Sequence, residues 1–180
     1  MSDDNKQWVY QPSADGLARF VLGTEGNNPL VCFGINPSTA RPNSLDPTVR
    51  RVKGLAARFE FDSWTMLNVY PQIATLPRDI GRELDQQLKI ENERRIEELI
   101  GGRRLTLLGA WGGLITSRPY LASLLADIVR VTDAAGCDWV SYGPPLKDGH
   151  PQHLSRATGG LPLGPFDMNS YLPRIVKRRD

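Results

Sequence analysis

The residues best suited to chemistry follow a short apolar run at positions 30–33. Four consecutive β-prone apolar residues are typical of a buried strand. Gly34 comes next and has no Cβ, so it allows a sharp turn or the close approach of a ligand. The proline after Asn36 stiffens the chain and favours an extended Asn36. The predicted strand end therefore presents the Asn36 amide and the hydroxyls of Ser38 and Thr39, groups that bind a polar ligand or cap a helix.

Polar and aromatic residues also follow three further apolar runs, at positions 64–67, 105–108 and 139–142, which we predict to be buried strands. In an open parallel sheet, ligands bind outside the carboxyl ends of the strands. We therefore expect a pocket for a small molecule or a nucleobase at that edge of the sheet. The candidate residues at these three strand ends are Asn68, Tyr70, Trp111, Gly112, His150 and His153.

Helical patterns separate the predicted strands. Asp46 resembles a helix cap with Pro47 at the first helical position, and apolar residues recur at helical spacing as far as Phe59. Further helices are predicted over 84–100, ending at a Gly-Gly pair, and over 120–135. This alternation predicts an α/β fold, in which helices flank a parallel β-sheet core in three layers.

The chain of 180 residues is expected to form a single α/β domain over 1–180. Residues 1–29 are expected to supply leading strands or an edge of the sheet. The segment 159–180 is rich in Gly and Pro near its start and is expected to be a loop-rich C-terminal tail. No internal repeat or linker is visible.

Composition excludes several classes of function. The hydrophobic content of 40%, the charged content of 23% and the net charge of +2 are those of an ordinary soluble protein, so charge gives nucleic-acid binding only weak support. No apolar run approaches the ~20 residues of a membrane span, and the polar start shows no signal peptide, so we expect a cytoplasmic protein without a membrane partner. Cys32 and Cys137 are expected to be reduced core residues, and neither a zinc-finger nor a Walker motif is present.

Each candidate residue also has a structural alternative. The amides of Asn36 and Asn68 could bond neighbouring loops, and Tyr70 and Trp111 could be core aromatics instead of stacking platforms. His150 is expected to be exposed in its turn, which leaves His153 as the better candidate of the two. The two histidines are spaced like metal ligands, but no third ligand is evident nearby, so we expect neither a metal nor a cofactor.

The first predicted helix contains two adjacent arginines, Arg50 and Arg51, which point about 100° apart on a helix. We expect one of them to face the cleft or an acidic partner and the other to be solvated, and we include Arg50 among the ligand-binding candidates. Asn92 falls on the apolar face of the second helix, where a buried amide requires hydrogen-bond partners.

Several motifs between residues 30 and 154 resemble, in the right order, a bacterial family with no established activity, domain of unknown function 1643. The family usually continues its histidine motif with Pro-Leu, whereas this chain continues His153 with Leu154 and Ser155. The matching motifs are Asn-Pro-Ser-Thr-Ala at 36–40, Asp-Pro-Thr-x-Arg-Arg at 46–51, Asn-x-Tyr at 68–70, Ala-Trp-Gly at 110–112 and Gly-x-Pro-x-His at 149–153.

The Gly-Ile-Asn-Pro motif at 34–37 is also similar to that of mismatch-specific members of the uracil-DNA glycosylase superfamily. This resemblance implies a uracil-DNA glycosylase-like fold. It implies that Asn36 holds a water molecule and that Asn68 reads a base edge. It further implies that Tyr70 stacks on the base and that His153 assists the leaving group, which makes Asn36 and His153 the catalytic candidates.

Two main functions remain open. An Asn is a poor general base, and the leucine-bearing wedge that extrudes a base from duplex DNA is not recognisable here. We therefore favour a domain that binds a nucleobase, nucleoside or nucleotide and releases little or no uracil from duplex DNA. The alternative is a hydrolase of N-glycosidic bonds, and a module that binds a protein partner is a third candidate. The sequence leaves the oligomeric state open.

Overall fold

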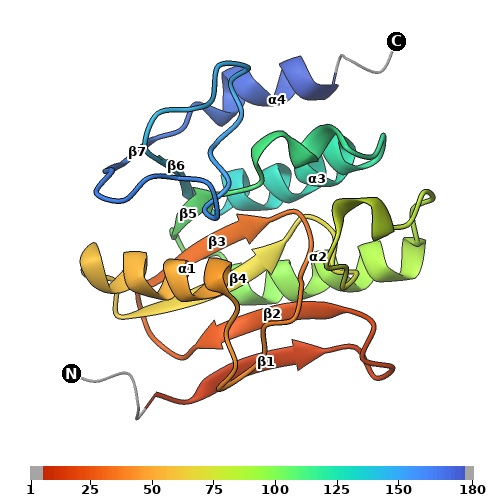
Figure 1. Cartoon of the computed structure of the whole chain (residues 1–180), viewed down its shortest axis with the longest axis horizontal. Coiled ribbons are helices and arrows are strands. Elements are labelled where there is room, and N and C mark those ends of the chain that lie inside the picture. Colours follow the sequence, from red (N-terminus) through yellow and green to blue (C-terminus); the bar gives the residue numbers. More distant parts are fainter. Residues whose placement is uncertain (1–5, 177–180) are drawn as a thin grey trace.

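Seven strands form one mixed sheet in a computed structural model that describes residues 6–176 (Figure 1). The order across the sheet is β1-β2-β4-β3-β5-β6-β7. The four central strands, β4, β3, β5 and β6, run parallel, whereas β1, β2 and β7 are antiparallel to their neighbours. The strands are β1 (Trp8–Pro12), β2 (Arg19–Thr24), β3 (Pro29–Gly34), β4 (Ser63–Asn68), β5 (Thr106–Gly109), β6 (Asp138–Tyr142) and β7 (Leu163–Pro165).

Helices cover both faces of the sheet. Helix α1 packs through one hydrophobic core on one face, and α2, α3 and α4 share a larger core on the other (Figure 1). In the part of the chain that the structure describes, no helix has the length and apolarity needed to cross a bilayer. The helices are α1 (Pro47–Arg58), α2 (Gln86–Ile100), α3 (Leu121–Ala134) and α4 (Met168–Val176), with short 3₁₀ turns η2 (Pro77–Asp79) and η3 (Gly112–Thr116).

The start of α1 shows how the local sequence sets an element. The Asp46 side chain accepts a hydrogen bond from the Val49 amide at 2.8 Å, and Pro47 occupies the first turn, where no intrahelical amide bond is lost. The apolar residues of the helix are buried against β3 and β4. At the other end of the sheet, α2 stops at Gly101, which adopts the left-handed conformation with φ 54°.

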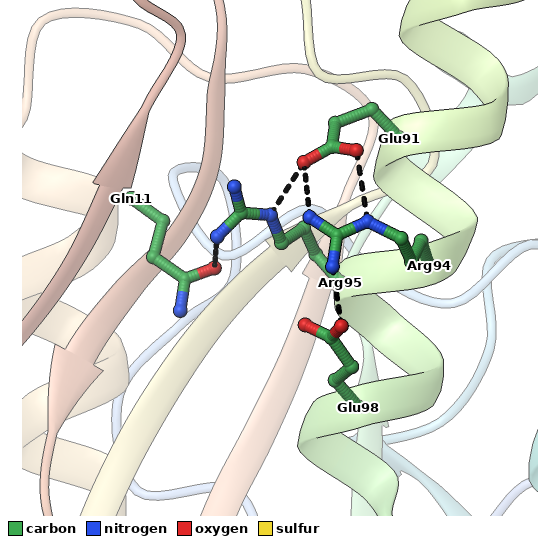
Figure 2. Close-up of polar contacts among 5 residues, drawn as sticks. All are labelled: Gln11, Glu91, Arg94, Arg95 and Glu98. Carbon is green, nitrogen blue, oxygen red and sulfur yellow. Dashed lines mark hydrogen bonds and ion pairs between the residues drawn. The ribbon is translucent and has the colours of Figure 1, made fainter.

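A polar network joins α2 to the first strand (Figure 2). Arg95 donates to Glu91 at 2.6 Å and to the side-chain oxygen of Gln11 in β1 at 3.0 Å, and Arg94 donates to Glu91 and Glu98. The two guanidinium groups lower the pKa of Glu91 to about 2. The adjacent arginines of α2 are thus used in contacts within the protein.

The structure confirms the four predicted buried strands and the three predicted helices to within about two residues at each end. The leading segment forms the antiparallel strands β1 and β2. The expected loop-rich tail is wrong over most of its described length, because it contains β7 and α4. Asp167 supports the start of α4 by accepting from the Ser170 amide at 3.0 Å, and the helix includes Pro173 in its interior.

A buried hydrogen-bond network fastens α4 to the sheet. The Trp111 indole donates to the Tyr171 hydroxyl at 2.8 Å, and His150 Nδ1 lies 2.8 Å from the same oxygen. A phenol hydroxyl both accepts and donates, so it satisfies both buried partners. The expectation that His150 is exposed is wrong, since only 2% of its surface is accessible.

Both cysteines are free thiols, as the sequence predicts, but only Cys32 is the core residue that was expected. Cys32 lies in the core of β3, where burial raises the pKa of its thiol. Cys137 is half-buried and donates weakly to the Arg103 carbonyl at 3.4 Å. Neither environment favours a reactive thiolate.

Candidate functional site

A cavity of about 420 Å³ opens at the carboxyl ends of the parallel strands, and we call it the carboxyl-edge cavity. The segments that follow all four parallel strands contribute to its wall, together with the start of α1 and the start of β2. The end of β3 and the loop after it contribute 34–39, and the start of α1 contributes 46–49. The remaining lining residues are Arg19, Met66, Ala74, Thr75, Pro77, Ala110, Leu114, His153 and Ser155.

This cavity brings together five of the residues that the sequence predicts for the site, namely Gly34, Asn36, Ser38, Thr39 and His153. Trp111 and Gly112 line a second cavity of about 430 Å³. The two cavities share four lining residues, including His153, so they are neighbours along the same edge. Arg50, Asn68 and Tyr70 line neither of them.

Asn36 has a defined orientation at the end of β3. Its Nδ2 donates to the Pro37 carbonyl at 3.0 Å and to the Ala74 carbonyl at 2.8 Å. These two bonds use both amide protons. The group that Asn36 offers to a ligand is therefore Oδ1, which is a hydrogen-bond acceptor.

His153 offers the complementary group. Its Nδ1 accepts from the Ser155 amide at 3.2 Å and lies 2.7 Å from the Ser155 hydroxyl, so the ring proton is on Nε2. Burial and the nearby Arg156 lower the pKa of His153, partly opposed by Asp46. His153 is consequently a neutral imidazole at neutral pH and a hydrogen-bond donor through Nε2.

Gly112 is packed against this histidine. It adopts a positive φ of 56°, and a Cβ built on it would lie 3.1 Å from the Cβ of His153. A larger residue would be strained and would push the imidazole out of place. Gly112 therefore acts on the site through the position of His153.

Asn68 lies behind the carboxyl-edge cavity. Only 1% of its surface is accessible, and neither its Oδ1 nor its Nδ2 has a hydrogen-bond partner among residues 6–176. A Cβ built on Gly34 would lie 3.0 Å from Asn68 Oδ1, so the amide is separated from the cavity by a residue without a side chain. The buried Asn92 donates to the carbonyls of Asn68 and Val69, whereas its Oδ1 has no partner among residues 6–176. The expectation that this amide requires partners is therefore met by its nitrogen alone.

Tyr70 and Trp111 are core aromatics in this structure. Tyr70 is 1% exposed and its hydroxyl accepts from the Asp85 amide at 3.2 Å. Trp111 has no accessible surface and packs edge-on against Trp139 and Phe166. Neither ring has an exposed face on which a base could stack.

The paired arginines of α1 diverge as expected. Arg51 donates to the Leu154 carbonyl at 2.8 Å, and its guanidinium carbon lies 5.6 Å from the Tyr142 ring centroid. Arg50 is exposed and lines a separate hollow beside Lys53. The partners of Arg51 are thus a carbonyl and a ring in place of a carboxylate, and Arg50 lies away from the cavity it was expected to line.

Two charged residues of the cavity were missed as site residues. Arg19 is 2% exposed, and its Nη1 donates to the Ala40 carbonyl at 2.7 Å. Burial lowers the pKa of Arg19 to about 10 despite the opposing effect of Asp46. The sequence signal that could have identified Arg19 as a site residue was a single charged residue between buried apolar neighbours. Asp46 was recognised only as a helix cap, although it also lines the cavity.

The fold and the site define an α/β protein with a cavity at the carboxyl edge of its parallel strands, lined by both apolar and polar side chains. The chain belongs to the family described as "Protein of unknown function (DUF1643)", whose model matches residues 19–153. This confirms the family that the motifs predict. The matched segment begins at Arg19 and ends at His153, so it includes every residue that lines the carboxyl-edge cavity except Ser155. No curated protein and no solved structure matches the chain.

Proposed function

We propose that this protein binds a nucleobase, nucleoside or nucleotide in the carboxyl-edge cavity. We further propose that its fold is related to that of the uracil-DNA glycosylases, with little or no release of uracil from duplex DNA. The observation that supports binding most directly is the pairing of an acceptor and a donor in one cavity, at Asn36 Oδ1 and His153 Nε2.

The edge of a nucleobase presents hydrogen-bond donors and acceptors side by side. Asn36 Oδ1 is suited to a base N–H, and the neutral His153 ring is suited to a base carbonyl or ring nitrogen. The hydroxyls of Ser38 and Thr39 line the same cavity and can do either. The cavity volume of about 420 Å³ lies in the ordinary range of ~300–1,000 Å³ for small-molecule sites.

The chemistry at Asn36 argues against efficient uracil excision. An amide cannot take a proton from water at neutral pH, so the general-base contribution of typically ~10²–10⁴ in rate is absent at this position. The buried Tyr70 and Trp111 offer no stacking face for an extruded base. A base in duplex DNA must also be flipped out at a cost of about a few kcal/mol.

Calorimetry with uracil, uridine and uridine monophosphate, and with the corresponding adenine series, tests the binding proposal. At least one compound should bind at sub-millimolar concentration. Replacing His153 with alanine should weaken that binding about tenfold, the value of one well-placed hydrogen bond. Arg50→Ala is the control, because Arg50 lies outside the cavity and should leave the affinity unchanged.

Two results would contradict the proposal. The first is the absence of binding by any of these compounds at millimolar concentration. The second is efficient release of uracil from duplex DNA by the unmodified protein, which would overturn the part that concerns inactivity.

A hydrolase of N-glycosidic bonds is a second candidate, favoured by one observation. Asp46 and His153 line the same cavity, so a carboxylate that can activate water faces the same space as a donor that can stabilise a departing base. Asp46→Asn is the matching test, because Asn is also a good helix cap and so keeps α1 intact. If free base is released from nucleosides or nucleotides, this variant should lose about 10²–10⁴ in rate; full activity in Asp46→Asn would eliminate the candidate.

A further inference from the structure

The carboxyl-edge cavity contains a buried cation without a bonded counter-ion. Only 2% of the Arg19 surface is accessible. Its Nη1 donates to the Ala40 carbonyl at 2.7 Å, while its Nε is buried and has no partner in the described residues, 6–176. No carboxylate of that part of the chain lies within 4.0 Å of the Arg19 guanidinium.

The position of Arg19 follows from the topology of the sheet. Strand β2 runs antiparallel to β4, so the first residue of β2 lies where β4 ends. The Arg19 amide accordingly donates to the Pro71 carbonyl, just beyond that end, at 3.0 Å. The guanidinium then reaches Ala40, whose neighbour Thr39 lines the cavity.

Burying this charge is unfavourable unless something compensates it. The pKa of Arg19 falls to about 10 because burial disfavours the charged form, yet the group remains a cation at neutral pH. Asp46 is the only carboxylate among the lining residues, and its Oδ1 accepts from the Val49 amide. Because Asp46 does not lie within 4.0 Å of the guanidinium, this carboxylate does not pair with the free donors of Arg19.

The start of α1, a helix of twelve residues, also lines the cavity, and Asp46 at this start is close enough to act electrostatically on Arg19. A helix N-terminus has a partial positive charge and presents amides that have no intrahelical partner. Pro47 has no amide proton and that of Val49 is donated to Asp46, which leaves the Thr48 amide. Ser38, Thr39 and Thr48, each with a side-chain hydroxyl, line the same cavity.

We propose that Arg19 and the N-terminus of α1 bind a phosphate group, so that the ligand is a nucleoside monophosphate. This rests on the proposed function, in which Asn36 and His153 receive the base. The bound phosphate supplies the acceptor oxygens that Arg19 lacks in the protein and compensates its buried charge. The single cation matches one phosphate group.

Calorimetry at pH 7.5 with matched pairs, a nucleoside and its 5′-monophosphate, tests the proposal on the unmodified protein. The monophosphate should bind at least about tenfold more tightly, since hydrogen bonds to charged groups contribute more than neutral ones. In Arg19→Met this preference should disappear, whereas the affinity for the nucleoside should stay within about twofold. Arg50→Met removes the same charge outside the cavity and should keep the preference.

The outcomes separate this inference from the function on which it rests. Equal affinity for nucleoside and monophosphate in the unmodified protein overturns the phosphate site and leaves nucleobase binding intact. Inorganic phosphate or ribose 5-phosphate binding as tightly as the nucleotide supports the phosphate site and overturns the nucleobase proposal. If Arg19→Met does not fold, Arg19→Lys is the second variant, because it retains the charge but not the planar fork. Its preference for the monophosphate should be reduced but not lost. An unchanged preference in Arg19→Lys would contradict bonding by the guanidinium.

Discussion

Replacing Gly34 with alanine should weaken ligand binding in the carboxyl-edge cavity by about 10- to 100-fold, while the protein remains folded. This factor corresponds to the usual cost of about 1–3 kcal/mol for overpacking a filled site. The added Cβ would lie 2.8 Å from Met66 Cε and 3.0 Å from Asn68 Oδ1. Asn68 is a fully buried residue of β4, whereas the Met66 methyl is the end of a flexible side chain and can move. Because Gly34 and Met66 both line the cavity, that movement reduces the space for a ligand.

Gly54→Ala is the matched control for this experiment. Gly54 is an exposed residue of α1, and a Cβ built on it would meet no atom within 4 Å. Alanine is preferred over glycine in a helix by about 1 kcal/mol, so this variant should be slightly more stable and should bind with unchanged affinity. If Gly34→Ala binds the ligand as tightly as the unmodified protein, the ligand does not occupy the part of the cavity next to β3.

The elements that local sequence determines were predictable. Helix α1 has both of its start signals within two residues, Asp46 and Pro47, and α2 has a glycine that stops it. Helix α4 was missed because it is short and contains Pro173, both of which argue against a helix in isolation. Its stability comes from tertiary packing, since Tyr171 is buried against the core that α3 shares.

The same distinction applies to the site. Asn36 and His153 could be assigned to one cavity because the carboxyl ends of parallel strands meet at one edge, whatever the order of the strands. Arg19 could not be assigned to this cavity, because it lies at the beginning of a strand. Only the antiparallel placement of β2 beside β4 brings the beginning of β2 to the same edge. Strand order is a property of the whole fold, and no short segment of the sequence contains it.

The buried state of His150 and the role of Trp111 depend on a partner far along the chain. Their shared partner, Tyr171, belongs to the segment that the sequence suggested was a loop. A histidine in a turn rich in glycine and proline is ordinarily exposed, and only the docking of α4 covers it. Errors of this kind follow directly from a missed long-range contact.

The largest expected effect on stability is that of Trp111→Ala, which should lower the free energy of unfolding by about 3–5 kcal/mol, the usual cost of removing a large buried aromatic side chain. Trp111 has no accessible surface, and its ring centroid lies 5.7 Å from that of Trp139 and 6.1 Å from that of Tyr171. The variant leaves a large void and removes the indole donor from the Tyr171 hydroxyl.

Urea denaturation followed by circular dichroism measures the change in the free energy of unfolding. Ile90→Ala is the control and should stay within about 0.5 kcal/mol, because Ile90 is 62% exposed. A loss below about 1 kcal/mol together with a selective loss of ligand binding would instead assign Trp111 to ligand recognition, since a core aromatic of this size cannot be removed so cheaply.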